Sequence, residues 1–177
     1  MYNPDYVPFT SPMPESQKFE GKVLIQMDSA DEVEVLSIRP SSLTGGATTS
    51  QFDIGRITKE IALSVFEKHF SEGADFSNML SDGYRMTISP KVKSMEYKFD
   101  QLSNAGFAIT PRVEVELQVI TYDQNGNISY SKTYSSGDYA GKTYGGSLNP
   151  SDEINKTLHR ALHELMTNAV RDTKVLR

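Results

Sequence analysis

Two histidines on one predicted C-terminal helix have a spacing that could support chemistry. His159 and His163 are four residues apart, and Glu164 follows them directly. Imidazoles at this spacing can share a metal ion, and HExxH enzymes add a glutamate inside the pair as the base. Here the glutamate stands outside the pair. At about 100° per residue from Leu158, the centre of the apolar stripe, both rings point sideways or outward. We therefore expect a solvated helix face and no metal site.

The loop Ser41–Ser50 contains a glycine pair ahead of a predicted helix. Thr44, Gly45 and Gly46 lie where a phosphate-binding loop would have its backbone N–H groups. The loop lacks the lysine of a Walker motif and the third glycine of a dinucleotide fingerprint. The pattern favours a flexible surface loop, and a partner-binding loop at Leu43–Ser50 is the alternative.

Other reactive groups do not form a recognisable set. Asp123–Asn127 resembles the opening of a calcium loop, but a tyrosine stands where the twelfth-position glutamate belongs, so a hairpin turn is expected. His69 falls late in a predicted helix and is expected to be half-buried and structural. The absence of cysteine excludes disulfides, thiol nucleophiles and thiolate zinc sites. We expect neither an enzyme nor a bound cofactor.

Tyrosines gather in one stretch rich in glycine and serine, Ser135–Ser147, and at its start. Tyr134, Tyr139 and Tyr144 recur at close spacing there. Tyrosine in such a loop provides rigid, amphipathic contact area and is typical of binding surfaces. Alternatively, the three rings pack inward and seal an open end of the sheet. Both readings stay open.

The elements that position these residues follow from periodicity. Odd residues from Phe107 to Val119 are apolar and polar residues alternate with them, which predicts a long strand with one buried face. Asn125 and Gly126 predict a hairpin turn before the returning strand Ile128–Tyr134. Pro150 is suited to the first turn of the closing helix, with Asn149 as its N-cap. The buried stripe of this helix is expected to be Ile154, Leu158, Ala161, Leu162, Leu165 and Ala169.

Earlier segments complete the predicted order. Lys22–Met27 and Val33–Ile38 are expected to be strands, and Tyr84–Phe99 a strand with a bulge or an edge position, because Pro90 interrupts it. Helical spacing starts at Asp53 or Ile54 and is expected to end at Gly73. The predicted fold is α+β, an antiparallel sheet of about four to five strands with two helices packed on one face, in the order β-β-α-β-β-β-α.

Composition indicates one domain preceded by a short tail. The chain has 177 residues and a net charge of -5, with no basic block, which argues against nucleic acid as the main partner. Residues 1–20 are rich in proline and are expected to be a tether or a strap, and residues 21–177 a single domain. No apolar run is long enough to span a membrane, and Met1 precedes no signal peptide. The protein is therefore either cytosolic or the mature form of an exported protein.

The C-terminal half combines an alternating strand, an Asn-Gly hairpin, an aromatic-bearing strand and a closing helix. These motifs stand in FAITPRVEVELQVITYDQNGNISYSKTYSSGDY and NPSDEINKTLHRALHELMTNAV. In this pattern residues 20–172 resemble the YajG-like family of bacterial envelope lipoproteins, and the auxiliary lipoproteins of ABC-type transporters have a similar pattern. The resemblance implies a lipid anchor just before Tyr2, a location on the periplasmic side of the outer membrane, and no catalytic residues.

Two functions are compatible with this sequence. The first is a non-enzymatic envelope domain that binds a protein partner or associates with itself through Leu43–Ser50, Gly137–Gly146 or a free sheet edge. The second is a carrier of a lipid or another small apolar ligand, which would serve an envelope transport system. Its candidate lining residues are Met79, Met86, Met95, Phe99 and Phe107.

Overall fold

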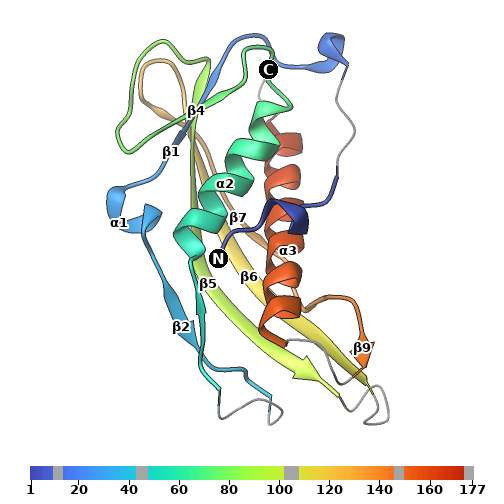
Figure 1. The fold of residues 1–177 in the computed structure, drawn as a ribbon. Helices are drawn as coiled ribbons and strands as arrows, with labels where there is room; N and C mark the ends of the chain where they lie inside the picture. The colour runs from blue at the N-terminus through green and yellow to red at the C-terminus, as the bar shows by residue number, and fades with distance from the viewer. Residues whose placement is uncertain (10–13, 43–47, 102–107, 146–149, 174–177) are drawn as a thin grey trace.

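The computed structural model describes residues 1–9, 14–42, 48–101, 108–145 and 150–173. Two long helices lie side by side on one face of a curved sheet (Figure 1). The elements are, in chain order, η1 Pro4–Tyr6, η2 Glu15–Gln17, β1 Val23–Gln26, α1 Ser29–Glu32, β2 Leu36–Ile38, β3 Ser50–Phe52, α2 Ile54–Glu67, β4 Ala74–Ser77, β5 Met86–Asp100, β6 Ala108–Tyr122, β7 Ile128–Ser135, β8 Tyr139–Ala140, β9 Tyr144–Gly145 and α3 Pro150–Thr173.

The predicted antiparallel sheet of four to five strands is wrong. Within the described residues the main sheet has seven strands and is mixed, in the order β4-β1-β5-β6-β7, with β8 and β9 also pairing to β6. β1 runs parallel to both β4 and β5, whereas β6 is antiparallel to both of its neighbours, β5 and β7. β2 and β3 form a separate antiparallel ribbon. The order of elements therefore also differs from the predicted one.

The position of β1 explains this error. All four residues of β1 are buried, because the strand lies between two parallel neighbours and both of its faces are covered. Parallel neighbours need a long crossover, and α2 provides it between β1 and β4. β4 reads Ala-Asp-Phe-Ser, which has too few apolar residues to predict a strand. The second predicted strand, Val33–Ile38, contains β2. This strand does not join the main sheet but pairs with β3, which begins at the end of the predicted small-residue loop.

The long hairpin was predicted correctly. β6 and β7 pair in antiparallel register, and Gly126 in the turn adopts a φ of 76°, which favours glycine. β5 continues through Pro90 and has a register shift between Val92 and Ser94, so the bulge reading of this strand is confirmed. β1 pairs only with Met86–Ile88, so β5 is interior to the sheet at its start, whereas from Pro90 onward its ladder partner in the described residues is β6.

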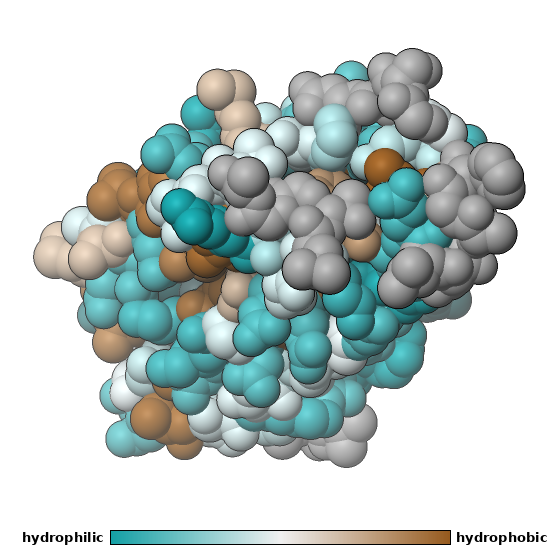
Figure 2. Space-filling view, turned by 90° about the horizontal axis from the view of Figure 1, so that it is seen from below, coloured by the Kyte–Doolittle hydropathy of each residue, from teal (hydrophilic) through white to brown (hydrophobic). Residues whose placement is uncertain are grey.

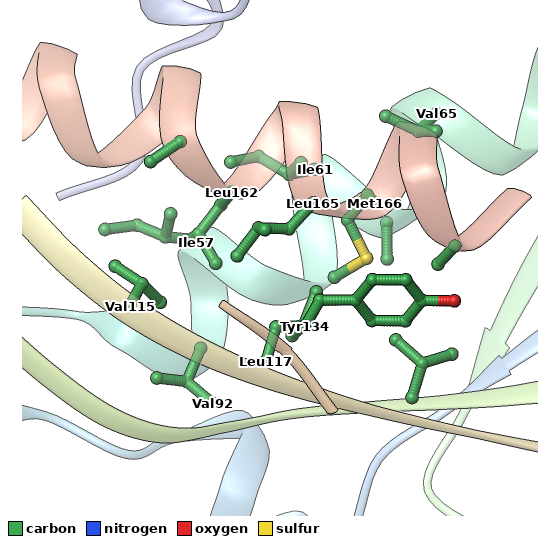
Figure 3. Close-up of a cluster of buried hydrophobic side chains, with 14 of the residues drawn as sticks. Ile57, Ile61, Val65, Val92, Val115, Leu117, Tyr134, Leu162, Leu165 and Met166 are labelled. Carbon is green, nitrogen blue, oxygen red and sulfur yellow. The ribbon is translucent and has the colours of Figure 1, made fainter. Parts of the chain in front are cut away.

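The core lies between the two helices and the sheet. Figure 3 shows side chains of α2, α3, β5, β6 and β7 meeting in this layer, among them Ile57, Leu165 and Leu117. The predicted buried stripe of α3 is buried throughout, and so are the odd residues Val113 to Val119 of β6. α2 ends at Glu67, before the predicted end at Gly73. Gly73 instead adopts a φ of 79° and leads into β4.

The N-terminal segment packs against the domain. Phe19 is buried, and its ring stacks on Phe70 with a centroid distance of 4.9 Å. η1 crosses α3, as the darkest blue ribbon in Figure 1 shows. The predicted proline-rich tail thus lies over the helical layer at residues 1–9, while residues 10–13 are outside the described part.

Candidate binding surface

The sheet face opposite α2 and α3, here called the open face, is mainly polar. The even-numbered residues of β6 point to this face, and among them Glu114 and Glu116 are exposed. At one end of this face Arg112 pairs with Asp100 and Asp138, at 3.2 Å and 3.1 Å. Such partly exposed ion pairs contribute little stability each, and they keep this end of the sheet solvated.

The other end of the open face carries an apolar patch. Met79 and Leu80, in the β4–β5 connection, are 75% and 52% exposed, and they line an open hollow of about 510 Å³ together with Ile120 and Tyr122. Ile128 is 62% exposed and is the ladder partner of Tyr122. We call this group of five residues the open-face patch. Exposed apolar groups collected in one place are typical of interaction sites.

Asn78 holds the connection that presents this patch. Its side-chain Nδ2 donates to the carbonyl of Met27 at 3.1 Å and to Oε2 of Glu32 at 2.8 Å. The side chain of Gln26 donates back to the carbonyl of Asn78 at 3.3 Å. Glu32 is itself paired with Lys59 at 2.7 Å, and this lysine and Asn78 lower the pKa of the Glu32 carboxyl. Met79 and Leu80 therefore project from an anchored backbone.

Carboxylates surround the patch. The acidic residues that line its hollow, or the neighbouring hollow of about 300 Å³ that shares Leu80 and Tyr122, are Asp28, Asp31, Asp82 and Asp123. Lys91 is the basic side chain in these linings, and it pairs with Asp31 at 2.7 Å. An apolar centre with an acidic rim is complementary to a partner surface that combines apolar and basic side chains.

The three tyrosines that the sequence singles out come together along β6. β7, β8 and β9 pair in succession with the same edge of this strand, so the rings recur at every fourth residue on its helix-facing side. The ladder partners of Tyr134, Tyr139 and Tyr144 are, in order, Leu117, Val113 and Ile109. Tyr134 and Tyr144 are buried and Tyr139 is half-buried.

Each of these tyrosines lies beside a different turn of α3. The hydroxyl of Tyr134 bonds to Tyr130 and to Asp172, both at 3.0 Å, and burial is the main cause that raises its pKa. Burial also raises the pKa of Tyr139 and Tyr144. This placement is the one in which the rings close the flank of the sheet. Thr44, Gly45 and Gly46 lie outside the described residues.

The prediction that both histidines of α3 face solvent is wrong. The side chain of His159 is fully buried and that of His163 nearly so. The angular position of a ring on α3 predicts exposure only if the sheet alone covers this helix. In the structure α2 and the N-terminal segment also pack on α3 and bury further sides of it. Burial lowers the pKa of both rings. Among the described residues, no group of three potential ligands is close enough to hold a metal ion.

Asp123 has a role in the turn itself. Its Oδ1 accepts the backbone N–H groups of Asn125 and Asn127 at 2.8 Å and 2.9 Å, and the bond from Asn127 is the main cause that lowers its pKa. Gly126 donates to the carbonyl of Asp123 at 3.0 Å. The segment is a hairpin turn, as predicted. His69 is half-buried as expected, and its Nδ1 bonds to the carbonyl of Val65 at 2.7 Å.

The residues proposed to line a lipid pocket do not share a cavity. Met95 and Phe99 fill the core, Met86 is half-buried against it, and Met79 projects into solvent. Phe107 is outside the described part. A hollow of about 1020 Å³ lies elsewhere and is lined mainly by polar and charged residues, including Lys18, Glu20 and Arg85.

The end of the molecule where β5 and β6 meet β9 is mostly hydrophilic. Figure 2, which views the molecule from below, shows hydrophobic residues there in small separate groups. None of the helices in the described ranges is both long enough and apolar enough to cross a membrane.

Comparisons with known proteins identify a shared fold. No family model and no curated protein sequence matches this chain. A Helicobacter pylori homologue of neuraminyllactose-binding hemagglutinin aligns with a TM-score of 0.45 and 10% identity, over 93% of this chain and 87% of its own. A Xanthomonas campestris protein of family DUF330 aligns with a TM-score of 0.57 and 12% identity, over 96% of this chain and 91% of its own. The chain is therefore similar in fold to this DUF330 protein along nearly its whole length.

Proposed function

We propose that this chain is a non-enzymatic binding domain of the bacterial cell envelope, which binds a protein partner or a second copy of itself through the open-face patch. The observation that carries the proposal is the exposure of Met79 and Leu80 on a connection anchored by Asn78. The periplasmic location and lipid anchor rest on the resemblance to YajG-like lipoproteins, and the fold shared with a DUF330 protein supports them.

The energetics favour a protein surface as the ligand of the patch. Burying an exposed side chain such as Leu80 stabilises a complex by up to about 1.5–3 kcal/mol. Two such side chains held in place provide an anchor without a large ordering cost, because the hydrogen bonds of Asn78 already restrict the backbone. The acidic rim then selects among partners by charge.

Site-specific photo-cross-linking in cells tests this proposal. A photoreactive amino acid at Leu80 should give a discrete adduct, and one at Glu114, exposed on the same face, should give none. Met79→Asp should weaken the adduct from Leu80 at least about tenfold, since it places a charge in the contact. Light scattering across a concentration range separates a self-associated species from a foreign partner. Equal labelling at both positions would refute the patch as the binding surface.

A further inference from the structure

The N-terminal segment Met1–Val7 is held on α3 by a set of specific contacts. The backbone N–H of Asn3 donates to Nε2 of His159 at 3.1 Å, and the side chain of Asn155 donates to the carbonyl of Met1 at 2.8 Å. The hydroxyl of Tyr6 donates to Asp152. These contacts join residues more than 140 positions apart in sequence, so the segment is docked by tertiary interactions alone.

His159 lies at the centre of this contact. Tyr2 stacks on its ring with a centroid distance of 5.5 Å, and Tyr6 meets the ring edge-on at the same distance. Its exposure is 0% with the segment in place. Nδ1 lies 2.8 Å from the carbonyl of Asn155, which accepts, so Nδ1 carries the proton and Nε2 offers its lone pair to Asn3.

Docking therefore requires a neutral ring. If Nε2 were protonated, it would be a donor that faces another donor, the backbone N–H of Asn3, and the hydrogen bond between them would be lost. The resulting charge would lie between two aromatic rings, away from water. The carboxylate of Asp152 is already engaged by Tyr6 and by Lys156 at 2.8 Å. The charged and titratable groups facing this contact are Asp152 and Lys156 of α3, Glu60 of α2, and Tyr2, Tyr6 and the amino group of Met1 in the segment.

We propose that Met1–Val7 is an acid-released latch, which stays docked on α3 while His159 is neutral and leaves when the ring takes up a proton. Its release would expose the surface of α3 that Tyr2 and Tyr6 cover. It would also let the N-terminal segment extend farther from the domain. Lys156 lies over the ring of Tyr6, 5.3 Å from its centroid, and pairs with Asp152, so the rest of the contact keeps its charges at mildly acidic pH.

The sign of the pH dependence follows from the two states. Burial is the main cause that lowers the pKa of docked His159, from the ordinary value of 6.5 to about 4. A ring uncovered by release titrates nearer 6.5, so the released state binds the proton more tightly. The docking constant is then independent of pH above about 6.5 and falls by at most about tenfold per pH unit below it. The fall ends near pH 4, where both states are protonated.

Hydrogen exchange of the full chain tests the latch. The amides of Tyr2 to Val7, corrected for the intrinsic effect of pH on exchange, should lose protection by at least about tenfold between pH 7 and pH 5, while those of β5 and β6 keep theirs. Titration of the His159 ring by NMR should give a pKa well below 6.5. A docked segment at pH 4 with unchanged protection, or a His159 pKa at 6.5, would overturn the proposal.

Two variants separate the latch from general acid sensitivity. His159→Gln retains an amide that can accept from Asn3 and removes the titration, so protection of the segment should no longer depend on pH. His69→Gln changes a half-buried histidine of the α2–β4 connection and should leave the pH dependence of the segment unaltered. If His159→Gln retained the pH dependence, another group would control docking and the proposal would fail. The NMR titration of the unmodified chain decides the question even if His159→Gln does not fold.

Discussion

Replacing Asn78 by alanine is expected to loosen the connection that presents the open-face patch. The change removes two hydrogen bonds, one to the carbonyl of Met27 and one to the carboxylate of Glu32. A neutral bond contributes about 1 kcal/mol and a bond to a charged group about 1.5–3 kcal/mol. Water replaces part of this loss, because the Glu32 side chain is 24% exposed and keeps its contact with Lys59. We therefore expect the free energy of unfolding to fall by about 2 kcal/mol.

Chemical and thermal unfolding followed by circular dichroism measures this effect. For a chain of this size, 2 kcal/mol corresponds to a fall in Tm of about 4–8 °C. Hydrogen exchange should accelerate at the amides of Met79 to Tyr84 more than in β6. Gln124→Ala is the matched control, because it removes an exposed amide side chain beside the neighbouring hollow of about 300 Å³ and should change stability by less than about 0.5 kcal/mol. An Asn78→Ala variant as stable as this control, with unchanged exchange, would refute the anchoring role.

Two further outcomes test the packing and the electrostatics. Leu117→Ala should lower the free energy of unfolding by about 2–5 kcal/mol, because Leu117 is fully buried between the sheet and α3. In the same urea titration, the control Glu114→Ala on the open face should change this free energy by less than about 0.5 kcal/mol. Urea midpoints should be constant above about pH 6.5 and fall below it, first because unfolding frees His159 to bind a proton. Below about pH 4.5 they should fall further, since hydrogen bonds from Lys59 and Lys156 lower the pKa of Glu32 and Asp152, and the stability those carboxylates contribute is lost as they protonate. Midpoints that rise on acidification would contradict both assignments.

Local periodicity was enough to predict the elements whose two faces differ. β6 alternates between core and solvent, and α3 has one continuous apolar stripe, so both could be recognised without knowledge of their neighbours. The hairpin between β6 and β7 was predictable for the same reason, because Asn125 and Gly126 favour a tight turn wherever they occur.

Elements that depend on distant partners could not be predicted in this way. β1 has no exposed face, and its parallel pairing depends on β4 and β5, far along the chain. His159 is buried by residues at the opposite end of the sequence, which the angular position of the ring on α3 does not reveal. The open-face patch could not be predicted from local pattern, because it joins Met79 and Leu80 of the β4–β5 connection to residues of β6 and β7 that lie about 40 or more positions later.

The position of β1 between β4 and β5 has a consequence for how the chain folds. β5, β6, β7 and α3 follow one another in sequence, and each packs on elements close to it in the chain. This half can therefore fold soon after it has been synthesised. β1 and β4, by contrast, are synthesised first and pair with each other, while β5 later provides the second neighbour of β1. The described strands of the first 85 residues therefore form two short pairs, β1 with β4 and β2 with β3. Two-stranded pairs are at most marginally stable in water, so this part of the chain depends on the hairpin of β5 and β6 for a stable sheet.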